Sequence, residues 1–265
     1  VPASDWRYQA IKAAGYPLVN WCVNYSHAVY DRVTALIVNH RIQVVDSPLW
    51  QFEGLVTAVA KAVPVVVRLV TSMRQLVTLE GYASLETRLI GDLEASFLQL
   101  SQGLIPLSQA ILDTCTELYG IDFTNYPHRV IYAGLKPLPE EAVSPPDGRT
   151  SEEPVVLFVG RLEKRKGILN LFEAIPEVLA RFPKAQFWLA GKDNSQYDGF
   201  AEQKKMTYAE YFQKVYRAYA GRVRFLGYVN DDQLHQLYDR CDVLVAPSLF
   251  ESFGLIFLEA INHAR

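Results

Sequence analysis

The chain has 265 residues, of which 50% are hydrophobic and 21% are charged, and its formal net charge is −3. This length and composition predict a globular protein with substantial apolar cores and exclude a chain that works in a disordered state. The slightly acidic balance gives no indication of a nucleic-acid partner.

The cysteines and histidines indicate neither a disulfide framework nor a metal site. Cys22, Cys115 and Cys241 lie far apart and form no Cys-x-x-Cys pair, and the five histidines lack the spacing of a zinc site. Reduced thiols predict a cytoplasmic location. No apolar run reaches the roughly 18–20 residues that span a bilayer, and the first residues lack the pattern of a secretory signal. We expect a soluble chain, and contact with a membrane surface stays open.

The first half of the chain alternates short β-rich runs with stretches of helical period. This alternation is typical of βαβ units around a parallel sheet. The predicted strands are 42–47, 63–70, 103–108 and 128–134, and the predicted helices are 54–62, 82–100 and 109–120.

The second half repeats the alternation after a segment that is rich in proline, acidic and small residues. Its predicted strands are 154–160, 185–191, 222–227 and 242–248, and its predicted helices are 168–182, 207–221 and 231–241, followed by one from about 253. We therefore predict an α/β protein with a first domain over 1–136, a linker over 137–153 and a second domain over 154–265. We expect both domains to be incomplete, because no clear first strand and glycine-rich turn open the chain and "EAINHAR" closes it within a predicted helix.

The segment "PSLFESFGLIFLEA" carries two glutamates that are eight residues apart. Its pattern predicts a helix with Glu251 at the entrance and Glu259 about two turns inside, roughly 10–12 Å away along the axis. The paired acids of glycosidases stand about 5–9.5 Å apart, so this spacing fits better the two ends of one extended ligand. Backbone N–H groups at the helix entrance would bind an anion between them, and Gly254 would let it approach closely. Such an arrangement predicts a nucleotide-sugar ligand.

The segment "VVLFVGRLEKRKGILNL" places positive charge at the end of a predicted strand. Arg161 stands at its carboxyl edge and Lys166 opens the next helix, whereas Lys164 and Arg165 are expected to face solvent. Ligands of open α/β sheets bind at this edge, so Arg161 and Lys166 could neutralise a diphosphate without a metal. The segment is not a Walker A loop, because its lysine precedes the glycine.

These two segments, together with "FWLAG" and "RVRFLGYVNDDQLHQLYDRCDVLVAPS", closely resemble the donor-binding half of retaining GT-B glycosyltransferases of family 4, also called glycosyl transferases group 1. The resemblance implies two Rossmann-like, doubly wound domains that face a cleft. It also implies that Arg161 and Lys166 contact the donor diphosphate. By the same resemblance, Glu251 contacts the donor sugar and Glu259 contacts the ribose. The further positions expected at the donor are Ser252, Phe253, Gly254, Leu255 and Gly191.

The first half resembles the acceptor domain of that family more weakly, through "VVDSPLWQFEG", "PVVVRLVTS", "GLIPLSQAI" and "RVIYAGL". Val70 stands where many relatives carry a histidine that faces the donor sugar, and the glycine-rich first turn is absent.

The resemblance implies metal-independent transfer of a hexose, with retention, from a nucleotide-sugar such as UDP- or GDP-sugar to a glycan, lipid or small molecule. Arg161, Lys166 and Glu251 would form the catalytic group, with no separate cofactor and no nucleic acid. Two alternatives stay open, a catalytically degenerate nucleotide-sugar-binding module of a larger protein and a GT-B epimerase or phosphorylase.

Overall fold

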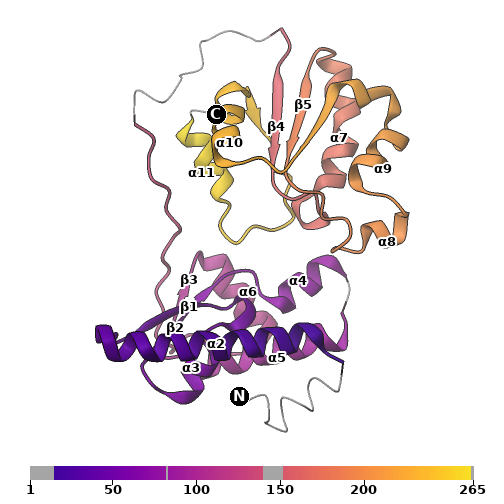
Figure 1. The fold of residues 1–265 in the computed structure, drawn as a ribbon. Helices are drawn as coiled ribbons and strands as arrows, with labels where there is room; N and C mark the ends of the chain where they lie inside the picture. The colour runs from indigo at the N-terminus through magenta and orange to yellow at the C-terminus, as the bar shows by residue number, and fades with distance from the viewer. Residues whose placement is uncertain (1–14, 82, 140–151, 264–265) are drawn as a thin grey trace. The chain divides into compact units, whose positions relative to one another are not determined.

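The structure, a computed structural model, describes residues 15–81, 83–139 and 152–263 (Figure 1). It divides into two compact units, Val1–Ala133 and Gly134–Arg265, and each is described by itself. Most of the predicted linker, residues 140–151, lies outside the described residues.

The first unit contains a three-stranded parallel sheet in the order β1-β2-β3. Its strands are β1 (Val45–Pro48), β2 (Val65–Leu69) and β3 (Gly103–Pro106). The central strand β2 buries every second side chain completely, at Val65, Val67 and Leu69. These aliphatic side chains stabilise the strand because they pack between the sheet and its helices.

The helices of the first unit include three that the sequence predicts, α3 (Leu55–Ala60), α5 (Leu85–Leu100) and α6 (Gln109–Tyr119). Two further helices, α2 (Pro17–His40) and α4 (Met73–Glu80), are not predicted. Helices α2, α3 and α5 pack together, and α6 packs on β2 and β3. A signal for α2 was present, because Pro17 opens the helix and its buried residues Val19, Cys22 and Ser26 have helical spacing.

The strand predicted over 128–134 is wrong. The segment follows β3 through the hydrogen bonds from Arg129 N to Leu104 O and from Ile131 N to Pro106 O, but it forms only one isolated bridge, between Leu104 and His128. Its apolar side chains suggested a buried strand, yet Ile131 and Tyr132 are exposed. Without burial on either face, apolar composition alone does not produce a strand here.

The second unit contains a four-stranded parallel sheet in the order β6-β5-β4-β7 (Figure 1). The chain order with one reversal at β4 is that of a doubly wound sheet. The strands are β4 (Val155–Val159), β5 (Gln186–Ala190), β6 (Val223–Gly227) and β7 (Val243–Leu244). The strand predicted over 242–248 is thus shorter than expected.

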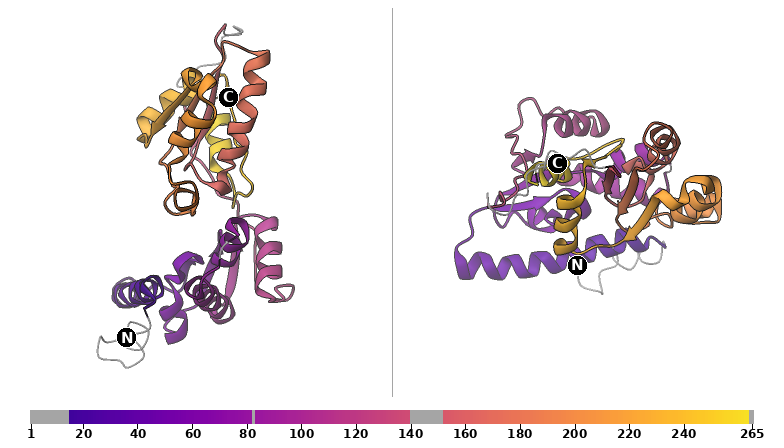
Figure 2. Two further views of the ribbon diagram at one scale, coloured as in Figure 1. Left: turned by 90° about the vertical axis from the view of Figure 1, so that its right-hand side faces the viewer. Right: turned by 90° about the horizontal axis from the view of Figure 1, so that it is seen from above.

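Helices cover both faces of this sheet (Figure 2). On one face lie α7 (Ile168–Arg181), α8 (Phe200–Lys204) and α9 (Tyr208–Val215), and on the other lie α10 (Asp231–Arg240) and α11 (Leu255–Asn262). Successive residues of β4 point to opposite faces of the sheet. Phe158 packs in the same core as Phe172 of α7, whereas Leu157 packs in the same core as Tyr238 of α10.

The helix predicted over 207–221 is interrupted. It ends at Val215 and continues as the 3₁₀ helix η4 (Arg217–Arg222). Tyr208 and Phe212 are fully buried on one side of this segment, whereas Val215 is exposed. Among the described residues, no helix is long and apolar enough to cross a bilayer.

Glu94, on α5, is completely buried in the first unit. Its carboxylate accepts hydrogen bonds from the Met73 backbone N–H at the start of α4, at 2.9 Å, and from the Tyr119 hydroxyl of α6. One carboxyl group thus connects three helices. Burial raises the pKa of Glu94 to about 7, and the hydrogen bonds from Tyr119 and Met73 oppose this increase.

The raised pKa of Glu94 predicts that stability depends on pH. The folded chain holds this proton more tightly than the unfolded chain, so the free energy of unfolding should fall as the pH rises from the ordinary value of 4.5 to about 7. The slope attributable to one such group is at most about 1.4 kcal/mol per pH unit. Urea unfolding at pH 5 and pH 7.5 should show a smaller difference for Glu94→Gln, whereas exposed Glu177→Gln should behave as the parent. An unchanged difference in Glu94→Gln would contradict this origin.

Candidate functional site

The predicted site residues lie at the carboxyl edge of the second unit's sheet and at the start of α11. Arg161 and Lys166 follow β4, Gly191 follows β5, and Glu251 follows β7. Because all four strands are parallel, these loops emerge at one edge of the sheet.

Glycines allow these loops to pack backbone against backbone. A Cβ atom at Gly191 would lie 1.9 Å from Gly160 O, and one at Gly167 would lie 1.9 Å from Pro247 O. Gly167 also has φ +68°, which a side chain disfavours. The structure therefore gives Gly191 a packing role between loops, and its predicted contact with the donor stays a prediction.

Lys166 and Glu251, which are far apart in sequence, form an ion pair. Lys166 Nζ lies 2.5 Å from Glu251 Oε1, and the Ser248 hydroxyl donates to the same oxygen at 2.7 Å. The two charged side chains are only 14% and 18% exposed. This partial shielding from water strengthens their attraction. Ser248 precedes Glu251 in the same loop, and no sequence pattern marks it as a site residue.

The predicted helix entrance at Glu251 is wrong. Helix α11 begins at Leu255 with Gly254 as its N-cap, so Glu251 belongs to the preceding loop, and Glu259 lies in the second turn. The expected separation of 10–12 Å along one helix axis therefore does not apply. Gly254, at φ +81°, interrupts the helical backbone between Glu251 and α11, and Glu251 pairs instead with Lys166 from another loop.

Arg161 extends toward solvent from the end of β4. Its side chain is 56% exposed, and Nη2 lies 3.3 Å from Glu163 Oε1. The carboxylate of Glu163 is buried and also accepts hydrogen bonds from Arg165 Nη2 at 2.8 Å and Asn194 Nδ2 at 2.9 Å. Arg161 is thus oriented by a fixed carboxylate and keeps an exposed guanidinium.

The expectation that Arg165 faces solvent is wrong. Its guanidinium is buried, bonds to Glu163, and donates from Nη1 to Phe250 O at 3.3 Å, while Leu249 N donates to Arg165 O at 2.9 Å. Arg165 therefore connects the loop of Lys166 to the loop of Glu251. Lys164 is half-buried, and its backbone N–H donates to Asp198 Oδ2 at 3.0 Å.

The start of α11 faces the same group of loops. Gly254 adopts φ +81°, and a Cβ at this position would lie 2.7 Å from the Phe257 ring. Ser252, Phe253 and Gly254 are half-buried, and Leu255 is exposed as the first helical residue. In the first turn the Phe257 N–H donates to Gly254 O at 3.0 Å, the N–H groups of the first two helical residues have no partner within the helix, and no side chain caps the turn. The turn thus has the geometry that favours an anion.

Glu259 is held from a neighbouring helix. Its Oε2 accepts a hydrogen bond from the Tyr238 hydroxyl of α10 at 2.7 Å. Tyr238 was not singled out in the sequence. No group of three His, Cys, Asp or Glu side chains suited to a metal ion occurs within the described ranges.

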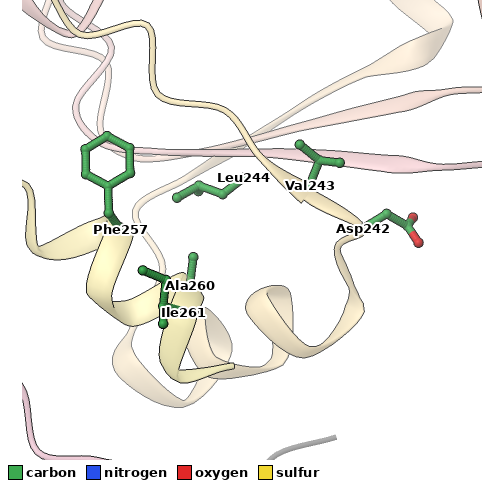
Figure 3. Close-up of a pocket in the computed structure, with 6 residues that line it drawn as sticks. All are labelled: Asp242, Val243, Leu244, Phe257, Ala260 and Ile261. Carbon is green, nitrogen blue, oxygen red and sulfur yellow. The ribbon is translucent and has the colours of Figure 1, made fainter. Parts of the chain in front are cut away.

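A separate apolar pocket of about 280 Å³ lies between β7 and α11 (Figure 3). It is lined by Asp242, Val243, Leu244, Phe257, Ala260 and Ile261. Asp242 is the one charged residue in this lining, and none of the predicted donor-binding residues belongs to it. The pocket is therefore distinct from the charged group around Lys166.

Comparison with known proteins finds a family that the second unit resembles. The family described as "Glycosyl transferases group 1" matches residues 153–265. This part of the chain is similar to that family. The match covers every predicted donor-binding residue, from Arg161 to Glu259.

Named relatives extend the similarity. The chain is 31% identical to glycogen synthase of Mycobacterium tuberculosis over 176 residues, which are 66% of this chain and 38% of the relative. It is 34% identical to the phosphatidyl-myo-inositol mannosyltransferase of Mycolicibacterium smegmatis over 147 residues, which are 55% of this chain and 33% of the relative. The chain thus spans well under half the length of these relatives.

Solved structures show the same fold. Sucrose-phosphate synthase from Thermosynechococcus elongatus matches 92% of this chain and 59% of its own, with a TM-score of 0.66 and 22% identity. Anabaena HepE, in complex with UDP and glucose, matches 88% of this chain and 60% of its own, with a TM-score of 0.61 and 22% identity. The predicted α/β fold of the GT-B type and the resemblance to the group 1 family are confirmed.

The close packing at Gly167 predicts that a methyl group will destabilise the second unit. Gly167→Ala must move the backbone near Pro247 and also strain a left-handed conformation, so we expect a loss of about 2 kcal/mol or more. Gly221→Ala is the matched control, because its Cβ would meet nothing within 4 Å. Urea unfolding should rank the two variants far apart, and equal stabilities would be inconsistent with the packing described.

The ion pair predicts non-additive effects of substitution. Lys166→Met and Glu251→Gln each leave a partly buried partner without its counter-charge, and each should lower the free energy of unfolding by about 1–2 kcal/mol. The double variant leaves neither charge and should lose less than the sum. A double-mutant cycle in urea measures this coupling, and strict additivity would argue that the pair contributes nothing.

Proposed function

We propose that the protein transfers a hexose from a nucleoside-diphosphate sugar to an acceptor hydroxyl, with retention of configuration and without a metal. The observation that carries the proposal is the meeting of Lys166 and Glu251, beside exposed Arg161 and the start of α11, within a group 1 glycosyl transferase domain. Two cations and a helix N-terminus suit the diphosphate, and a carboxylate next to them suits the hydroxyls of the attached sugar.

The proposed reaction follows from charge. The bond between the anomeric carbon and the diphosphate oxygen breaks, and the acceptor oxygen bonds to that carbon on the same face. The acceptor proton passes to a diphosphate oxygen, so the products are a glycoside and a nucleoside diphosphate. Arg161, Lys166 and the first turn of α11 would stabilise the negative charge that develops on the leaving diphosphate.

Lys166 has a counter-charge before the donor arrives. Its pairing with Glu251 lowers the cost of keeping both groups away from water. A bound diphosphate would share Lys166, and the released Glu251 oxygen could then accept hydrogen bonds from the hexose. Glu259, on the next turn of α11, would accept hydrogen bonds from the ribose.

The donor and acceptor are proposed only by class. HepE is described with UDP and glucose, which favours a UDP-sugar, and a GDP-sugar is the other candidate. The names glycogen synthase and phosphatidyl-myo-inositol mannosyltransferase suggest a glycan or a lipid headgroup as acceptor, the latter at a membrane surface. The cysteines are free and buried, in keeping with a cytoplasmic reaction.

Thermal stabilisation tests the donor site. The melting temperature is measured with UDP, GDP and ADP and with their glucose and mannose conjugates. We expect one nucleotide to raise it, both with and without EDTA. A ligand that binds only the folded state stabilises that state by about 2.7 kcal/mol at 100 times its Kd. Arg161→Ala should lose the shift, whereas Arg181→Ala, on the exposed surface of α7, should keep it. A shift abolished by EDTA would refute metal independence, and no shift with any nucleotide would refute the donor site.

Kinetics then separate transfer from binding. Glu259→Ala should mainly weaken nucleotide affinity, by about 1.5–3 kcal/mol, and Glu251→Ala should mainly lower turnover. Nucleotide binding without transfer or donor hydrolysis would favour the binding-module alternative. Equal loss of nucleotide affinity in both variants would contradict the division of roles.

A further inference from the structure

Tyr238 controls the position of the Glu259 carboxylate. Its side chain is 1% exposed within the core between the sheet and helices α10 and α11. Its hydroxyl donates to Glu259 Oε2 at 2.7 Å. Within the described part of the chain, this is the one hydrogen bond found for the Glu259 carboxylate, so Tyr238 sets its orientation.

The ring of Tyr238 is itself fixed. It stacks on the His263 ring, with centroids 5.3 Å apart and an interplanar angle of 21°. His263 is buried and bonds through Nδ1 to Asp239 Oδ1 at 2.7 Å, while its Nε2 lies 2.8 Å from His235 Nδ1. These contacts link α10 to the end of α11, so Tyr238 cannot change its position without disturbing both helices.

The hydroxyl of Tyr238 can act only as a donor to Glu259 at neutral pH. Burial and the hydrogen bond to Glu259 raise the pKa of Tyr238 far above its ordinary value. The proton therefore stays on the phenol, and Tyr238 donates a hydrogen bond to Oε2 of Glu259. The remaining acceptor sites of the carboxylate can then accept hydrogen bonds from ligand hydroxyls.

We propose that Tyr238 is a positioning residue that holds Glu259 in the orientation needed for ribose, and thereby makes the site prefer ribonucleotides to nucleotides that lack the ribose hydroxyls. The inference rests on the proposed function, which assigns the ribose to Glu259. A carboxylate that is already oriented loses less conformational freedom when ligand hydroxyls bind, so the contact contributes more to affinity.

Calorimetric titration tests the proposal. The parent chain, Tyr238→Phe and Tyr119→Phe are titrated with UDP, GDP and ADP and with the 2′,3′-dideoxy form of each. The best parent ribonucleotide should bind about tenfold more tightly than its dideoxy form. Tyr238→Phe should bind that ribonucleotide about fivefold more weakly and the dideoxy form as the parent does. Tyr119→Phe removes a comparable buried hydroxyl from Glu94 in the other unit and should leave both affinities unchanged.

The outcomes separate the inference from the function on which it rests. A full ribose preference in Tyr238→Phe would overturn the positioning role and leave the donor site intact. An equal loss of ribonucleotide and dideoxynucleotide affinity would also overturn it, because it indicates general damage. A parent that binds none of the nucleotides, or binds both forms equally, would overturn the ribose assignment of Glu259 and with it the inference.

A second variant covers the case in which Tyr238→Phe does not fold. Glu259→Asp keeps the charge but shortens the side chain by one methylene, which withdraws it from Tyr238. This variant should lose most of the preference for the ribose hydroxyls. Retention of the full preference would show that the orientation set by Tyr238 is irrelevant, and the proposal would be wrong.

Discussion

The backbone contact between Gly167 and Pro247 is the constraint on which the candidate site depends. It allows the loop after β4 and the loop after β7 to touch without an intervening side chain. Arg165 then bonds across the contact to Phe250 O, and Lys166 reaches Glu251. Without this close approach, the cation and the carboxylate would belong to separate surface loops, with no common ligand.

The charged side chains near this contact form ion pairs with one another. Buried Glu163 balances buried Arg165 and orients Arg161, whose guanidinium remains exposed. Glu251 balances Lys166. The site thus presents positive charge to a ligand while the supporting charges are already paired, which avoids leaving an isolated ion in the protein interior. Asn194, from the loop after β5, completes the support through its hydrogen bond to Glu163.

The sequence predicts what depends on local patterns. Runs of apolar residues predicted β4 and β5, and the position of Arg161 after a predicted strand indicated the edge of the sheet where the charged residues lie. It fails where a distant residue decides the outcome. Arg165 is buried because it bonds to Glu163 and Phe250, Glu251 pairs with Lys166 from a distant loop, and Tyr238 meets Glu259 only when α10 packs beside α11. These contacts join loops or helices that are far apart in the sequence, and the periodicity within each segment does not predict them.

The pairing of β4 with β7 has a consequence for the order in which the second unit folds. Val156 pairs with Val243, and the intervening chain contains α7 to α10 with β5 and β6. Closing so long a loop loses much conformational entropy, and the strand pairing offsets this loss only once it has formed. Contacts of this kind therefore form late. On a ribosome, β4, β5 and β6 can assemble while the chain is still being made. The loop that carries Glu251 emerges after them, so the charged group around Lys166 is completed only after these three strands have been made.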